Sequence, residues 1–294
     1  MNQICRIGYA RFETPDPGRQ EHYYTNVLGL RAVTREADRV YLACPLDQCS
    51  VVLERGGASS CVELGFHLPA SADLAAYARQ LADYGVCAER QADPAPGIAS
   101  RLLFRDPKGT KVAVFNEPPQ RVAESPPNGV GPSTLGHVAF NVQDVAKAVD
   151  FYCEVLKFKF SDSIEDFFVF LRCNANHHTV NFARGQRSKI HHVAFEVRDW
   201  AHLQVACDHL SKNGYPIIWG PGRHGCGHNI FAYHRDPEGN IVELFAELDQ
   251  MREELGYYEP KPWHRERPQV PKIWPADPRA SNLWGPMPPD GFLD

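Results

Sequence analysis

The second half of this 294-residue chain repeats the first half at nearly constant offsets, which constrains the fold more than any other feature. RIGYARF at 6–12 aligns with TLGHVAF at 134–140, and HYYTNVLGL at 22–30 aligns with DFYCEVLKF at 150–158. VELGF at 62–66 aligns with HHVAF at 191–195, and DPKGTKVAVFNE at 106–117 aligns with DPEGNIVELFAE at 236–247. A register kept over this length indicates duplication of a supersecondary unit.

A shorter repeat lies inside the second half. His137-Val-Ala-Phe and His192-Val-Ala-Phe are each followed by an Asp seven residues later, at Asp144 and Asp199. The apolar spacing after each Asp predicts a helix that this Asp caps, and Gly214 is the predicted end of the second helix. Apolar runs predict strands at 167–171, 180–183, 229–233 and 241–246. We therefore predict an α+β fold of four βαβββ units that pair into two domains.

Composition sets the predicted domain boundaries. We expect an N-terminal domain at 1–118, a linker rich in Pro, Gly and Ser at 119–132, a C-terminal domain at 133–250 and a tail at 251–294. Nine of the 24 prolines and three of the five tryptophans lie in the last 35 residues, so we predict that this tail is irregular.

Charge and cysteine usage exclude several classes of protein. The net charge of −5 and the lack of long Lys/Arg runs disfavour nucleic acid and anionic lipid as partners. No stretch reaches the ~18 apolar residues of a membrane span, and the first residues lack the apolar region of a secretory signal. Nine cysteines without a C-x-x-C pair disfavour a disulfide framework, so we expect a cytoplasmic protein.

Three residues on strand-like segments form a candidate metal site: His137, His192 and Glu243. Two imidazoles and one carboxylate can hold a divalent metal on one face and leave the opposite face open, which suits Fe(II). A carboxylate in the apolar run IVELFAE would otherwise cost several kcal/mol when buried. His192 is favoured over its neighbour His191 because His192 aligns with His137, and neighbours on a strand face opposite ways.

The first half lacks this set of residues. Tyr9, Glu63 and Ala113 occupy the positions that align with His137, His192 and Glu243. We therefore predict a metal-free, non-catalytic N-terminal domain and a catalytic C-terminal domain.

At these residues the chain resembles type I extradiol ring-cleavage dioxygenases, the catechol 2,3-dioxygenase-like enzymes of the vicinal oxygen chelate superfamily. The segment GRHGCGHNIFAYHRDPEGNIVE at 222–243 matches the signature of these enzymes, except that Ala232 replaces a larger aliphatic residue. The resemblance implies paired glyoxalase/bleomycin-resistance-like domains and a tail that covers the active site. It places the family's metal ligands on His137, His192 and Glu243.

The resemblance also assigns roles to three further residues. His178, the second His of NHHTV, falls on the acid–base histidine of the family. His224 falls on a histidine that contacts substrate, and Tyr233 falls on the active-site tyrosine. From its place in the strand FFVFL, Phe170 is a candidate for the floor of the substrate pocket, with core packing as the alternative.

The expected activity is Fe(II)-dependent cleavage of a catechol ring by O2 beside the diol, giving a hydroxymuconic semialdehyde-type product. Mn(II) is an alternative metal because the same ligands accept it. A neutral catechol or an alkyl, chloro or aryl derivative is the expected substrate, unless Arg265, Arg267 and Arg279 of the tail bind a carboxylate. Family habit implies a homo-oligomer, a tetramer or larger. The alternatives are a glyoxalase-like isomerase or epimerase and a non-enzymatic small-molecule-binding protein of the same fold.

Overall fold

The structure, a computed structural model, describes residues 3–116, 128–252, 257–259 and 271–292. Its element order confirms the four βαβββ units. The first unit comprises β1 (Arg6–Thr14), α1 (Pro17–His22) with the π-helical turn η1 (Tyr23–Val27), β2 (Arg31–Arg35), β3 (Arg39–Ala43) and β4 (Val51–Arg55). The second comprises β5 (Ser60–His67), α2 (Leu74–Asp83), β6 (Glu89–Ala95), β7 (Ile98–Arg105) and β8 (Lys111–Phe115).

The second half repeats this order. The third unit comprises β9 (Thr134–Val142), α3 (Val145–Asp150) with the π-helical turn η2 (Phe151–Val155), β10 (Lys159–Ile164), β11 (Phe168–Arg172) and β12 (Val180–Arg184). The fourth comprises β13 (Lys189–Glu196), α4 (Trp200–Lys212), β14 (Trp219–Arg223), β15 (Ile230–Arg235) and β16 (Ile241–Ala246). β10 and β14 were not among the predicted apolar runs, because KFSDSI is largely polar and WGPGR contains two Gly and a Pro.

The two halves form two sheets of the same design. Their strand orders are β2-β3-β4-β1-β5-β8-β7-β6 and β14-β15-β16-β13-β9-β12-β11-β10-β19. In each sheet the first strands of the two units pair antiparallel in the centre, β1 with β5 and β9 with β13. The fourth strand of each unit pairs in parallel with its first strand. Each sheet therefore has an approximate two-fold axis between its central strands.

Helix ends in the second half follow the predicted signals. Asp144 accepts a hydrogen bond from the Lys147 backbone N–H at 2.9 Å, and Asp199 accepts one from the His202 N–H at 2.8 Å. Gly214 has φ of 82°, the left-handed conformation that a side chain would disfavour at this helix end.

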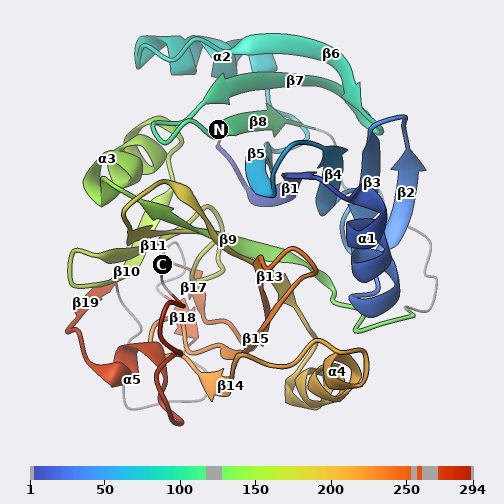
Figure 1. Ribbon diagram of the computed structural model, residues 1–294. Coiled ribbons are helices and arrows are strands. Elements are labelled where there is room, and N and C mark those ends of the chain that lie inside the picture. The colour runs from blue at the N-terminus through green and yellow to red at the C-terminus, as the bar shows by residue number, and fades with distance from the viewer. Residues whose placement is uncertain (1–2, 117–127, 253–256, 260–270, 293–294) are drawn as a thin grey trace.

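The two halves lie one above the other in Figure 1. Hydrogen bonds to two D-P-x-G turns, at 106–109 and 236–239, join them. The Tyr152 hydroxyl donates to Asp106 Oδ2 at 3.1 Å, and Gln20 Nε2 donates to Asp236 Oδ2 at 3.0 Å. The main apolar core also draws residues from both halves. The predicted linker at 119–132 lies mostly outside the described residues, and the domain boundaries stay a prediction.

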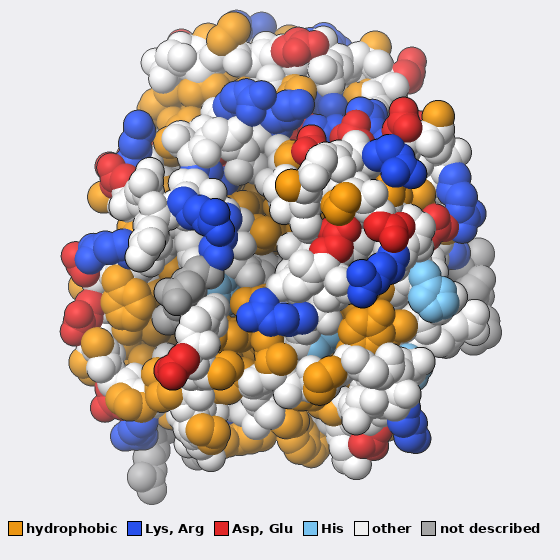
Figure 2. All heavy atoms as spheres, viewed as in Figure 1, with side chains coloured by type: hydrophobic (Ala, Val, Ile, Leu, Met, Phe, Trp, Pro, Cys, Tyr) orange, Lys and Arg blue, Asp and Glu red, His pale blue; other side chains and the backbone are white. Residues whose placement is uncertain are grey.

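The tail adds short elements to the second half. They are β17 (Gln250–Arg252), β18 (Tyr257–Glu259), β19 (Lys272–Trp274) and α5 (Pro278–Ser281). β19 pairs in parallel with β10 and so becomes the ninth strand of the sheet. Hydrophobic side chains gather on the surface around β19 and α5 (Figure 2). Arg265 and Arg267 lie outside the described residues. Across the described ranges, no helix has the length and apolar character to cross a membrane.

Candidate metal centre

Strand register brings the three predicted metal ligands to one face of the C-terminal sheet. His137 on β9 and Glu243 on β16 are both paired with Ala194, on the strand β13 between them. Directly paired residues face the same side of a sheet, and His192 lies two residues before Ala194, so it faces that side too. The short sequence repeat that predicted the ligands therefore corresponds to the pairing register of β9, β13 and β16.

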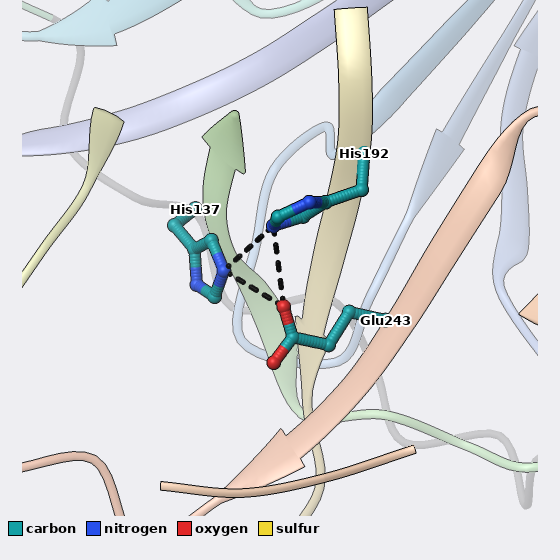
Figure 3. Close-up of side chains that lie close together, drawn as sticks. All are labelled: His137, His192 and Glu243. Atoms are coloured by element: carbon teal, nitrogen blue, oxygen red, sulfur yellow. Dashed lines mark hydrogen bonds and ion pairs between the residues drawn. The ribbon is translucent and has the colours of Figure 1, made fainter. Parts of the chain in front are cut away.

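The three side chains converge on a single point (Figure 3). His137 Nε2 lies 3.0 Å from Glu243 Oε2, and His192 Nε2 lies 3.2 Å from the same oxygen. The two Nε2 atoms are 3.3 Å apart. All three residues are buried.

This triangle fits a divalent metal. Metal–nitrogen bonds of about 2.1 Å place neighbouring ligands of an octahedron about 3.0 Å apart, close to the three distances observed. Two imidazole nitrogens and one carboxylate oxygen are a donor set that iron and manganese accept. The residues present therefore fit a divalent metal ion.

A neighbouring histidine directs the lone pair of His192 toward this point. His191 Nε2 donates to the Phe292 carbonyl at 2.8 Å, so its Nδ1 is left as an acceptor. His192 Nδ1 lies 2.6 Å from that nitrogen and therefore donates to it. His192 Nε2 is then unprotonated and directed at the triad, which is the state of a metal ligand.

The electrostatics favour the charge states that metal binding needs. Burial lowers the pKa of His137 in spite of the nearby carboxylate, so its imidazole is neutral. Burial alone would raise the pKa of Glu243, but the surrounding histidines, His137 foremost, outweigh burial and hold that pKa well below its usual range. Asn229, which the sequence analysis missed, donates to Glu243 Oε1 at 3.1 Å and leaves Oε2 to the histidines.

A cavity of about 130 Å³ opens beside the triad. An apolar cavity of roughly 150 Å³ binds benzene, so this one has room for about one aromatic ring. Its wall includes every predicted site residue: His137, His178, His192, His224, Tyr233, Glu243 and Phe170. Phe170 stacks on Phe168 with ring centroids 4.5 Å apart, and both line the cavity.

His224 and Tyr233 contact one another on the cavity wall. His224 Nδ1 donates to the Ser281 carbonyl at 2.6 Å, so its Nε2 accepts from the Tyr233 hydroxyl at 3.1 Å. His224 Nε2 also lies 3.8 Å from Glu243 Oε1. Burial, and then the charge of Glu243, raise the pKa of Tyr233 well above its usual value, so its hydroxyl stays protonated.

His178 precedes β12, and its ring centroid lies 4.3 Å from that of His137. It is 3 % exposed. Burial, and then the neighbouring His137 and His177, lower its pKa well below the usual value, so the ring is neutral. It is placed to exchange a proton with a molecule in the cavity.

Several cavity residues carried no signal in the sequence analysis. Trp219 stacks on Tyr233 at 5.2 Å between centroids, and Phe292 of the tail packs against both. Asn181 on β12 is paired with Ala139 as Glu243 is paired with Ala194, and it also lines the cavity. Within the described ranges its buried Oδ1 has no hydrogen-bond partner. An alignment of the two units of the second half, β12 with β16, would have placed Asn181 at the position of Glu243.

In the N-terminal sheet the equivalent positions hold an ion-pair cluster. Glu63 is 1 % exposed and accepts from Arg101 Nη1 and from the Tyr9 hydroxyl, both at 2.7 Å. Arg11 Nη2 lies 3.0 Å from its other oxygen. Arg101 thus supplies a positive charge beside Glu63, which takes the position of His192. The adjoining cavity is only about 20 Å³.

Replacing Arg101 with Met should destabilise the fold, because Glu63 would lose one of its two arginine partners while still buried. Breaking a buried pair from one side costs about 3 kcal/mol. Denaturant unfolding would measure the loss, with Arg105→Met, an exposed arginine on the same strand, as the control. Equal stability of the two variants would contradict this account.

Comparison with known proteins finds a matching superfamily and relatives that are named as a metapyrocatechase and a catechol dioxygenase. Residues 134–244 match the Glyoxalase/Bleomycin resistance protein/Dioxygenase superfamily. The chain is 29% identical to metapyrocatechase 2 of Cupriavidus necator, covering 99% of this chain and 92% of that protein. It is 26% identical to 3-methylcatechol 2,3-dioxygenase of Pseudomonas putida, covering 82% and 89%.

Solved structures share the whole fold. A Mn(II)-bound glyoxalase from Novosphingobium aromaticivorans gives a TM-score of 0.84 at 23% identity, covering 100% of this chain and 98% of that one. Homoprotocatechuate 2,3-dioxygenase from Brevibacterium fuscum gives 0.82 at 22% identity, covering 99% and 92%. These likenesses confirm the predicted paired vicinal-oxygen-chelate fold.

Proposed function

We propose that this chain, a member of the glyoxalase/bleomycin resistance protein/dioxygenase superfamily, is an Fe(II)-dependent extradiol dioxygenase that cleaves a catechol ring with O2 beside the diol. The observation that carries the proposal is the convergence of His137, His192 and Glu243 beside a ring-sized apolar cavity. Relatives named as catechol dioxygenases over most of the chain support the reaction class. Mn(II) is the alternative metal, since the Novosphingobium glyoxalase, which has a similar fold, binds Mn(II).

His137, His192 and Glu243 would hold the metal, which would supply open coordination positions and a Lewis-acid charge that favours ionisation of a diol. Side chains that line the cavity would supply the proton transfer and the hydrogen bonds to the diol. His178 Nε2 takes up a proton from the diol and returns one as the ring opens. The Tyr233 hydroxyl turns from His224 to donate to an ionised diol oxygen, and His224 fixes the position of that hydroxyl.

Aromatic side chains would orient the ring and exclude water. Phe170, Trp219 and Phe292 present apolar surface to the cavity. Among the described residues that line it, none is Lys or Arg. A neutral catechol, or one with an alkyl, chloro or aryl substituent, therefore fits better than a carboxylated one.

Cytoplasmic location and a homo-oligomeric state are part of the same proposal. All nine cysteines are free thiols in the structure, which is consistent with a reducing compartment. Gel filtration with light scattering would measure the oligomeric state.

Oxygen uptake tests the function. The protein would be loaded anaerobically with Fe(II) or with Mn(II) and offered catechol, 3-methylcatechol, a chlorocatechol, a dihydroxybiphenyl and a carboxylated catechol. We expect one O2 consumed per ring, a yellow product and the lowest rate with the carboxylated diol. Uptake with none of the diols and neither metal would overturn the proposal in favour of a glyoxalase-like isomerase or a binding protein.

A further inference from the structure

A buried carboxyl group lies behind the catalytic histidine, at the end of a short series of polar side chains. His177 Nδ1 lies 3.0 Å from His178 Nδ1, and His177 Nε2 lies 3.2 Å from Asp162 Oδ2. Asp162 and His177 are 0 % exposed. Neither was assigned a role by the sequence analysis, and Asp162 does not touch the cavity.

The environment of Asp162 favours a carboxylate. Its Oδ1 accepts from the Lys272 backbone N–H at 3.1 Å, and its Oδ2 accepts from Trp274 Nε1 at 2.8 Å. Both oxygens therefore act as acceptors, which a protonated carboxyl cannot match as well. Both donors belong to β19, the tail strand that pairs with β10 at Asp162.

This carboxylate determines the protonation of both histidines in turn. A lone pair on His177 Nε2 would face the negative oxygen at 3.2 Å, so Nε2 carries the hydrogen even though its N–H is not aligned as a hydrogen bond. His177 Nδ1 is then an acceptor, and His178 Nδ1 donates to it. Consequently His178 Nε2, on the other side of the ring, is left unprotonated toward the cavity.

The pair His191–His192 uses the same arrangement at the metal site. There the Phe292 carbonyl is the acceptor outside the pair, as Asp162 is for His177 and His178. His192 Nε2 is left unprotonated as a result. Two His-His dipeptides are thus each fixed by an acceptor outside the pair. The tail takes part in both cases, since Phe292 belongs to the tail and Asp162 accepts hydrogen bonds from Lys272 and Trp274.

We infer that Asp162 and His177 are positioning residues that hold His178 in the Nδ1–H tautomer, and that β19 must be seated for this to occur. The inference rests on the proposed function for the role of His178 in ring cleavage. It adds that proton transfer at His178 Nε2 depends on Asp162, a side chain that does not line the substrate cavity. It also gives the tail a part in the chemistry besides covering the cavity.

Asp162→Asn tests the inference, because an amide replaces the charge with little change in shape. We expect kcat to fall about 10- to 100-fold, while metal content and KM for the diol stay within about twofold. The matched control is Asp166→Asn, an exposed carboxylate that pairs with Arg184 and should leave kcat unchanged. Unchanged kcat in Asp162→Asn would overturn the inference.

A double-mutant comparison separates positioning from a general loss of structure. In a His178→Asn background, Asp162→Asn should lower the residual kcat by less than about twofold, since both changes act on one proton transfer. If Asp162→Asn lowers kcat by the same factor in both backgrounds, its effect is structural and the inference is wrong.

Nitrogen NMR of the full chain, labelled with [15N]histidine and loaded with diamagnetic Zn(II), gives a readout without activity. The His178 signals are those that disappear in His178→Asn. We expect protonated Nδ1 and unprotonated Nε2 in the wild type, and a shift toward protonated Nε2 in Asp162→Asn. A wild-type ring protonated at Nε2, or the same pattern in both proteins, would refute the inference. Because no diol is needed, this result stands even if the oxygen electrode rejects the proposed function.

Discussion

Glu243→Gln should lose its metal and its turnover together. The substitution keeps the size of the side chain but removes the only negative charge among the three side chains that converge 3.0–3.3 Å apart. Changes to residues behind a metal ligand weaken binding by about 10- to 100-fold, so loss of a charged ligand should weaken it at least about 100-fold. Oxygen consumption should then fall below about 1% of the wild-type rate.

Elemental analysis after gel filtration would measure metal retention, and the oxygen electrode would measure turnover. Glu154→Gln makes the same chemical change at an exposed position on η2 and serves as the control. Thermal unfolding adds an independent test, because a metal that binds only the native state raises the midpoint. We expect Fe(II) to raise the midpoint of wild type and of the control but not of Glu243→Gln. Wild-type iron content with full activity would refute the ligand assignment.

His178→Asn should separate binding from chemistry. The ring packs beside His137 but is not one of the three converging side chains, so metal content should not change. The substitution removes the group proposed to carry a proton, and general acid–base catalysis contributes about 10²- to 10⁴-fold. We therefore expect kcat to fall by about that factor, with KM for the diol within about threefold of wild type.

Single-turnover measurements with anaerobic diol and a pulse of O2 would locate the slow step. His22→Asn, at an exposed histidine on α1, is the matched control and should behave as wild type. A His178→Asn rate equal to that of the control would remove the proposed role. A tenfold rise in KM with unchanged kcat would point to substrate binding instead.

The sequence predicted the fold because the fold is repetitive. The same pattern of strands and helix occurs four times, so each unit supports the prediction of the others. A ligand position found in one unit can be transferred to the next by aligning the two units. His192 was preferred to His191 on this basis, and the pairing of β13 with its neighbours places it on the same face as His137 and Glu243. Helix caps such as Asp144 are local signals, and these also appear where predicted.

The parts that escaped prediction depend on contacts between segments far apart in the chain. Asn229 gains its role only because β15 and β16 bring it to Glu243. Phe292 comes from the tail, which has no counterpart in the repeat. Asp162 lies in the polar strand β10, where nothing in the sequence distinguishes a buried carboxylate from a solvated one.

The approximate two-fold axis between β9 and β13 makes the active site an incomplete version of a symmetric one. His137 and His192 are mates across this axis, and the mate of Glu243 is Asn181, whose buried Oδ1 has no hydrogen-bond partner in the part of the chain that the structure describes. Exact symmetry would set a second carboxylate at the position of Asn181, so that four ligand-type side chains would surround one point. The neutral amide at that position leaves one quadrant around the triad without a charged ligand.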